Sequence, residues 1–267
     1  FLIAPSGWIA RALSPWATGW DTPPDLLLVN DPAGLALTFG LIAKEVPFLM
    51  LMALAALPQT DAARRITLAE TLGYSRAMGF ALTVLPALYR QLRLPVYAVL
   101  AYAMTTVDMA QILGPTLPPT LSVQITLWMT DPDLSGRPLA AAGALLQLAL
   151  VIAALGFWRG AEVAARRTLR HLAEQGHRGA GLDRLAVALA TLGAGTTTAA
   201  LLAGLAGLAL WSLAGLWPFP DILPEAYSLQ TWTRAGPGVW QATAATAGLG
   251  LATALIALAL VLGCLEA

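Results

Sequence analysis

The sequence predicts an all-α fold, a polytopic bundle of transmembrane helices, from its composition and from the length of its apolar runs. Hydrophobic residues make up 58% of the 267 residues, charged residues make up 11%, and the mean hydropathy is +0.70. A soluble domain carries about 25% charged residues, so this balance indicates a membrane protein. A helix needs about 20 mostly apolar residues to cross a bilayer. About five segments qualify: Ala33–Leu57, Leu94–Leu113, Leu139–Trp158, Leu185–Leu213 and Val239–Leu262.

Two of these expected spans carry residues that disturb a helix. Pro47 is expected to kink the first span, because proline lacks the backbone N–H that an interior turn uses. Gly193 and Gly195 are expected to loosen the fourth, which is also long enough to tilt or to begin as a surface helix.

The distribution of basic residues predicts the orientation of the spans, since cytoplasmic loops are enriched in Lys and Arg. Eleven arginines fall in the loops after the first and third expected spans: Arg64, Arg65, Arg76, Arg90, Arg93, Arg159, Arg166, Arg167, Arg170, Arg178 and Arg184. The opposite side holds only three, namely Arg11, Arg137 and Arg234. Loop 58–93 and linker 159–184 are therefore expected in the cytoplasm. The opposite loops hold most of the tryptophans, which we interpret as anchors at the membrane interface.

Several classes of partner and cofactor are excluded or disfavoured. The net charge of zero argues against a nucleic acid and leaves the lipid bilayer as the expected surroundings. Cys264 is the single cysteine, so neither an intramolecular disulfide nor a cysteine metal cluster is expected. His171 and His177 lie in the linker without nearby carboxylates and are expected to be solvated, so no metal site is predicted.

Because the chain begins with Phe1 and stops directly after an apolar run, we expect this sequence to be an internal piece of a longer polypeptide.

The loop between the first two expected spans carries the most specific pattern. Residues 61–73, DAARRITLAETLG, favour a helix with Asp61 as its N-cap, and Gly73 permits a turn after it. A second short helix, capped by Ser75 and closed before Pro86, is predicted to follow. The spacing indicates a short rigid cytoplasmic element at the membrane ends of its neighbours, although an interfacial amphipathic helix would have a similar pattern.

This loop resembles the EAA loop of type I, binding-protein-dependent ABC transporter permeases. Leu72-Gly73-Tyr74-Ser75 matches the glycine core of the family motif, and Phe80 and Val84-Leu85-Pro86 match its end. Thr67-Leu68-Ala69 stands where the family has Glu-Ala-Ala, and Glu70 lies three residues later. The usual alanine after the glycine is Tyr74. The resemblance therefore assigns ATPase coupling to the segment, with these candidate residues: Glu70, Leu72, Gly73, Tyr74, Ser75, Arg76, Phe80 and Pro86.

The resemblance extends over most of the chain. Residues 37–59 and 98–115 resemble the spans on either side of the family loop, and the N-terminal loop is most similar to the YnjC-like branch. The end of the chain resembles the start of another permease unit, as in fused two-unit permeases. The resemblance then divides the chain into three parts. Residues 1–158 are expected to form the back part of a first permease unit, which includes the coupling loop 58–93. Residues 159–184 are expected to form a cytoplasmic linker, and residues 185–267 the front part of a second unit.

The resemblance implies a type I ABC importer fold and a set of partners. ATP-binding cassette subunits, expected in two copies, would bind the coupling loop, and an extracytoplasmic solute-binding protein would deliver a small solute. The sequence has no G-x-x-x-x-G-K-[ST] phosphate loop, so ATP is expected on the partner and this chain is expected to bind no cofactor itself. It also has no H-E-x-x-H or G-x-S-x-G motif, and we expect no catalytic residues and no enzyme activity.

Ionisable residues within the expected spans form a second candidate site. Such groups usually pair in the bundle interior or serve a transport path. Lys44 is expected to pair with Asp108 across helices, either to fix packing or as part of a translocation path. The candidate path residues are Lys44, Glu45, Thr105, Thr106 and Asp108. An alternative function is an ion-coupled secondary transporter that uses Glu45 and Asp108.

Overall fold

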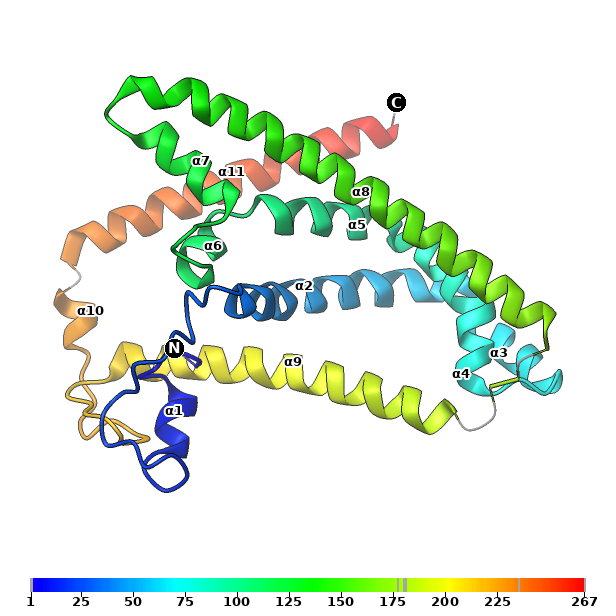
Figure 1. Cartoon of the computed structure of the whole chain (residues 1–267), viewed down its shortest axis with the longest axis horizontal. Helices are drawn as coiled ribbons and strands as arrows, with labels where there is room; N and C mark the ends of the chain where they lie inside the picture. Colours follow the sequence, from blue (N-terminus) through cyan, green and yellow to red (C-terminus); the bar gives the residue numbers. More distant parts are fainter. Residues whose placement is uncertain (1, 177, 180–181, 235, 267) are drawn as a thin grey trace. The chain divides into compact units, whose positions relative to one another are not determined.

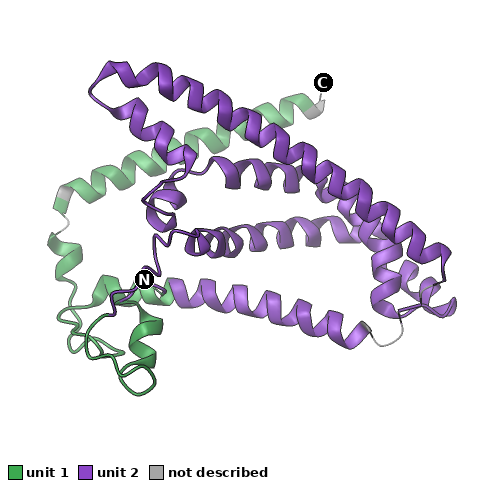
Figure 2. Ribbon diagram, viewed as in Figure 1, with its two compact units in different colours: residues 1–2, 6–23, 205–267 green, residues 3–5, 24–204 purple. Residues whose placement is uncertain are grey.

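A computed structural model describes residues 2–176, 178–179, 182–234 and 236–266, and within them the chain is helical, with two isolated β-bridges and no strand (Figure 1). The fold class predicted from composition is confirmed. The chain divides into two compact units (Figure 2). Unit 1 comprises residues 1–2, 6–23 and 205–267, and unit 2 comprises residues 3–5 and 24–204. The expected boundaries between two permease units stay a prediction.

Unit 2 contains most of the helices. In chain order they are α2 (Leu35–Ala56), the 3-10 turn η1 (Leu57–Thr60), α3 (Ala62–Thr71), α4 (Arg76–Gly79), the π-helical η2 (Phe80–Val84), α5 (Leu85–Thr105), α6 (Asp108–Leu113), α7 (Leu121–Thr130), the 3-10 turn η3 (Leu134–Gly136) and α8 (Arg137–Glu174). α9 (Leu182–Leu213) begins in unit 2 and ends in unit 1. α5 packs against both α2 and α8, and α7 folds back along α8 (Figure 1).

Four helices of the described chain are long and apolar enough to cross a membrane. They correspond to Leu35–Thr60, Leu134–Glu174, Asp183–Leu213 and Gly238–Cys264. Each contains or overlaps an expected span. Their outer faces expose large apolar side chains, for example Leu145 and Phe157 on α8, which is the surface that lipid rather than water covers. α8 continues to Glu174, so much of the expected linker 159–184 is an extension of this helix.

The second expected span, Leu94–Leu113, is not one continuous helix. α5 ends at Thr105, Thr106 is extended with ψ of 134°, and α6 begins at Asp108. Thr105, Thr106 and Val107 are β-branched and lower helix propensity.

Neighbouring side chains satisfy the backbone at this interruption. The Ser122 hydroxyl donates to the Thr106 carbonyl at 2.8 Å, and the Gln147 amide donates to the Met104 carbonyl. Each bond replaces a helical partner that the break removes. Residues 94–113 were expected to form one span, but the tertiary contacts interrupt the helix, and this segment is not among the four helices that are long and apolar enough to cross a membrane.

Unit 1 contains α1 (Trp8–Leu13), the end of α9, α10 (Gln230–Arg234) and α11 (Gly236–Glu266). Arg11 ties its loops together, because its guanidinium donates to the carbonyls of Pro218 at 2.7 Å and Asp221 at 2.9 Å and lies over the Trp217 ring. Burial lowers the pKa of Arg11 from its ordinary value, and the nearby Asp221 opposes this shift. The Trp217 indole donates to the Asp221 carbonyl, so this ring also has a bonding role inside the unit.

Candidate functional site

The segment between α2 and α5 folds as a helix, a glycine turn and a short helix, as the sequence predicts. At the end of α3 the Gly73 N–H donates to the Glu70 carbonyl at 2.9 Å, and the Tyr74 N–H donates to the Ala69 carbonyl at 3.0 Å. Gly73 has a φ of +84°. This left-handed conformation costs a residue with a side chain roughly 1–2 kcal/mol. The predicted glycine turn is confirmed, and its geometry explains why glycine stands at this position.

The two predicted helix caps have different outcomes. The Ser75 hydroxyl oxygen accepts a hydrogen bond from the Met78 N–H at 3.3 Å and so caps α4, as predicted. Asp61 directly precedes α3, but its side chain caps nothing. Its φ of +49° is left-handed, whereas a capping residue is usually extended. The prediction of a side-chain cap at Asp61 is therefore wrong.

The second short helix does not close before Pro86. α4 continues through the π-helical turn Phe80–Val84 directly into α5, with Pro86 in the first turn of α5. The Leu85 N–H donates to the Phe80 carbonyl five residues earlier, which widens the turn. This wider turn immediately before Pro86 accommodates the proline, which has no N–H to donate inside a helix. The segment is consequently joined without interruption to a long helix of unit 2.

The eight candidate coupling residues lie together in segment 58–93, which we call the hairpin, but their exposure differs. Glu70 and Arg76 are exposed, while Tyr74 and Phe80 are half-buried. The hairpin is tightly packed where α3 meets α4, since a Cβ added at Gly79 would lie 2.8 Å from the Ala69 Cβ. Its outer surface carries two apolar side chains one helical turn apart. They are Leu68, 56% exposed, and Leu72, 68% exposed.

The linker binds the beginning of α4, a contact that the sequence did not reveal. The Arg178 carbonyl accepts from the Ser75 N–H at 2.8 Å. The Asp183 carboxylate accepts from the Ala77 N–H at 2.7 Å and from the Arg76 N–H at 3.3 Å. We call Arg178, Gly179 and Asp183 the linker clasp.

Glycine is required in the clasp by space as well as by conformation. Gly179 has a φ of +69°, and a Cβ there would lie 2.9 Å from the Met78 Cβ. The available sequence signal was a glycine-rich stretch followed by an aspartate, HRGAGLD. That pattern suggests a cap for the helix that follows, not for one a hundred residues earlier.

A buried carboxylate links α5 to α8. The Glu162 side chain is only 3% exposed and lies 2.8 Å from Arg159 Nη1 and 3.4 Å from Arg93 Nε. The Tyr89 hydroxyl donates to it at 2.8 Å and accepts from the Trp158 indole. Sequence reasoning treated the two arginines only as orientation signals and missed Glu162. Its position three residues after Arg159 was the available clue.

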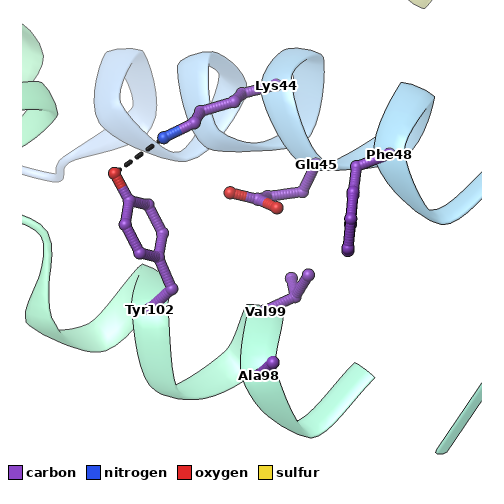
Figure 3. Close-up of a pocket in the computed structure, with 6 residues that line it drawn as sticks. All are labelled: Lys44, Glu45, Phe48, Ala98, Val99 and Tyr102. Carbon is purple, nitrogen blue, oxygen red and sulfur yellow. Dashed lines mark hydrogen bonds between the residues drawn. The ribbon is translucent and has the colours of Figure 1, made fainter. Parts of the chain in front are cut away.

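A pocket of about 320 Å³ lies between α2 and α5 and includes two of the candidate path residues (Figure 3). It is lined by Lys44, Glu45, Phe48, Ala98, Val99 and Tyr102. The Lys44 ammonium donates to the Tyr102 hydroxyl at 2.7 Å and lies 4.1 Å from the centre of the same ring. This combination of hydrogen bond and cation–π contact satisfies the ammonium without a carboxylate.

The expected ion pair between Lys44 and Asp108 is wrong. In the part of the chain that the structure describes, the salt bridges all involve Glu162. Asp108 lies beyond the helix break, in the first turn of α6, where a carboxylate interacts favourably with the helix dipole.

The remaining path candidates flank the same break. The Thr105 hydroxyl donates to the Ala101 carbonyl in its own helix, and Thr106 is buried. The structure therefore brings Lys44 and Glu45 into one pocket, while Thr105, Thr106 and Asp108 are not among the residues that line it. Of the linker histidines, His171 lies 2.9 Å from the Gln175 amide, and His177 is outside the described residues.

The chain is similar to the inner membrane ABC transporter permease protein YnjC of Escherichia coli (strain K12), with 33% identity over 132 residues. The matched region covers 49% of this chain and 25% of that protein, so the chain spans about a quarter of the relative's length. No family model matches the sequence, and no solved structure matches it. This partial likeness to an ABC transporter permease is the basis of the functional proposal that follows. Together with the four apolar helices, it makes this a multi-pass protein of the inner membrane.

Proposed function

We propose that this chain belongs to the permease of an ABC importer, which moves a small solute into the cytoplasm by alternating access. The observation that carries the proposal is the likeness to an ABC transporter permease, combined with a folded hairpin between two apolar helical regions. In this proposal the hairpin 58–93 receives the movement of two ATP-binding subunits. A solute-binding protein on the opposite side delivers the cargo, and no ATP is bound by this chain.

The hairpin has the surface expected of a docking element. Leu68 on α3 and Leu72 directly after this helix are exposed, although the charge distribution predicts an aqueous cytoplasmic location for this segment. Neighbouring exposed leucines are typical of surfaces that a partner protein covers. Glu70, on the same helix, is exposed and available for a polar contact at the edge of such an interface.

The hairpin is also connected so that a movement of it reaches other helices. It continues into α5, which Glu162 links to α8. It is tied to the start of α9 by the carboxylate of Asp183. A rigid-body displacement of α4 would therefore move α5 and the start of α9 without any local unfolding.

The alternative, an ion-coupled secondary transporter, has less support from the geometry. It needs Glu45 and Asp108 to act along one path, but only Glu45 lines the pocket between α2 and α5. A secondary transporter also has no use for a rigid cytoplasmic hairpin with exposed leucines.

The decisive experiment co-expresses this chain with the ATP-binding subunit of the transporter to which the proposal assigns it. We expect Leu68→Ser/Leu72→Ser to reduce both the co-purification of that subunit and the ATP-dependent uptake of solute. The control Thr67→Ser/Thr71→Ser, on α3, should have little effect on either. Uptake that persists after ATP depletion but collapses with the ion gradient would support the secondary transporter and refute the proposal.

A further inference from the structure

The pocket between α2 and α5 holds one positive and one negative side chain that form no salt bridge with each other. Lys44 and Glu45 both line it, and within the described chain Glu45 also accepts no hydrogen bond. Figure 3 shows the Lys44 side chain extended toward Tyr102, with the Glu45 carboxylate on the side of Phe48. Opposite charges attract strongly in apolar surroundings, so their separation needs a physical cause.

Tyr102 keeps the Lys44 ammonium away from the carboxylate. Its hydroxyl accepts from the ammonium at 2.7 Å, and its ring centre lies 4.1 Å from the same nitrogen. An ammonium group has three N–H donors, and this hydrogen bond uses one of them. Two donors of Lys44 and the carboxylate oxygens of Glu45 therefore stay available to a ligand in the pocket.

The two charges lie near the middle of a candidate membrane span. α2 belongs to the span Leu35–Thr60, and Glu45 follows its first residue by ten positions, a rise of about 15 Å. The hydrocarbon core of a bilayer is about 30 Å thick. Ionisable groups at this depth are costly against lipid and usually face the interior of the bundle or a water-filled cavity. We therefore expect this face of α2 to point toward the interior of the permease.

The other lining residues indicate the size and polarity of an occupant. Phe48, Ala98 and Val99 are apolar and form the rest of the wall with the Tyr102 ring. The volume of about 320 Å³ is at the lower end of the range for small-molecule sites, which is roughly 300–1,000 Å³. The pocket thus suits a small solute that has an apolar portion.

We propose that this pocket binds the transported solute, and that the solute is a small zwitterion with one ammonium and one carboxylate group. The carboxylate of the solute accepts from Lys44, and its ammonium group donates to Glu45. A solute with a single charge would leave either Lys44 or Glu45 without a counter-charge at this depth, which is costly. The inference rests on the proposed function, because it assigns the cargo of that permease.

The binding test uses the full chain in detergent, without the ATP-binding subunit, and isothermal titration calorimetry. The probes are L-leucine and γ-aminobutyrate, two zwitterions with different distances between their charges. Each is compared with the acid that lacks its amino group and with the amine that lacks its carboxyl group. We expect at least one zwitterion to bind about tenfold more tightly than both of its analogues, the difference expected for one charged hydrogen bond.

Substitutions of the pocket should change this selectivity in opposite directions. Glu45→Gln should weaken zwitterion binding about tenfold but spare the acid, whereas Lys44→Met should weaken it similarly but spare the amine. Ala98→Leu fills the pocket and should weaken the binding of every probe. The controls Glu174→Gln and Ala55→Leu change exposed positions outside the pocket and should change no affinity.

A conservative variant separates a lost site from a damaged fold. Glu45→Asp keeps the negative charge and should retain the preference for the zwitterion over the acid. Thermal unfolding of each variant in the same detergent shows whether the protein is folded during the titration. Loss of the preference in a folded Glu45→Asp protein would argue against a role of the charge.

Several results would overturn the proposal. They are the absence of binding of either zwitterion, equal affinity for the zwitterions and their analogues, and zwitterion binding that neither Glu45→Gln nor Lys44→Met weakens. ATP-dependent uptake that survives both substitutions would refute the pocket as the solute site and leave the proposed function intact. Zwitterion binding that needs both residues, together with uptake that does not need ATP, would instead refute the proposed function and support the site.

Discussion

Replacement of Glu162 by glutamine should destabilise the contact between α5 and α8 while preserving the shape of the side chain. The carboxylate is 3% exposed and interacts with Arg159 at 2.8 Å and Arg93 at 3.4 Å. Glutamine keeps an oxygen that accepts from the Tyr89 hydroxyl but loses the negative charge. Two arginines would then face each other without their shared counter-ion.

The expected cost follows from the exposure of the three side chains. Removing one member of a fully buried ion pair costs about 3–5 kcal/mol. The side chains of Arg93 and Arg159 are 36% and 43% exposed, so both regain water when the carboxylate charge is lost. We therefore expect about 2 kcal/mol for Glu162→Gln, close to the value of one charged hydrogen bond.

The assay is equilibrium unfolding in mixed micelles as the fraction of denaturing detergent rises. Glu174→Gln, an exposed carboxylate near the end of the same helix, serves as the control and should change little. Arg159→Gln combined with Glu162→Gln should cost less than the sum of the single changes, because the pair is coupled. A free energy of unfolding within about 0.5 kcal/mol of the native protein for Glu162→Gln would refute the interpretation of this cluster as a stabilising link.

Four further predictions follow from single contacts. Gly73→Ala should lower the free energy of unfolding of the hairpin by about 1 kcal/mol, because φ is +84°; an unchanged value would contradict the strain argument. Asp183→Ala should speed hydrogen exchange of the first amides of α4, whereas unchanged protection would mean that the Asp183 carboxylate does not stabilise the start of this helix. Arg11→Gln should cost about 3 kcal/mol in tryptophan-monitored unfolding of unit 1, and a loss below 1 kcal/mol would argue against its hydrogen bonds. Backbone N–H groups of α2 hold the pKa of Asp31 below its ordinary value of 3.8, so its cap stabilises α2 above that pH and is lost as pH falls through the folded-state pKa. The protection factors of the amides at the start of α2, which are corrected for the intrinsic pH dependence of exchange, should fall on acidification in the native protein and not in Asp31→Asn.

The sequence alone determined the helical membrane class, because that property depends on composition and on the length of apolar runs. It also determined the hairpin, since the glycine turn and the Ser75 cap are local backbone requirements that few residue types meet. Not every local prediction was correct, because the Asp61 side chain does not cap α3 although the Ser75 hydroxyl caps α4.

Predictions that joined distant residues failed, because contact partners are set by tertiary packing. Lys44 was expected to pair with Asp108, but the break after Thr105 puts Asp108 in a separate helix and leaves Lys44 against Tyr102. One prediction within a single segment also failed: Pro86 was expected to end a helix, but the π-helical turn before it accommodates the proline.

The sequence by itself determined which segments are apolar, which are basic, and where the chain must turn. Only the tertiary structure decided that Asp183 would cap α4, that Glu162 would hold two arginines, and that Lys44 would bind a tyrosine of α5. The physical reason is that the residue type at a position fixes the charge and size of its side chain, whereas the residue that this side chain contacts depends on which helices pack together.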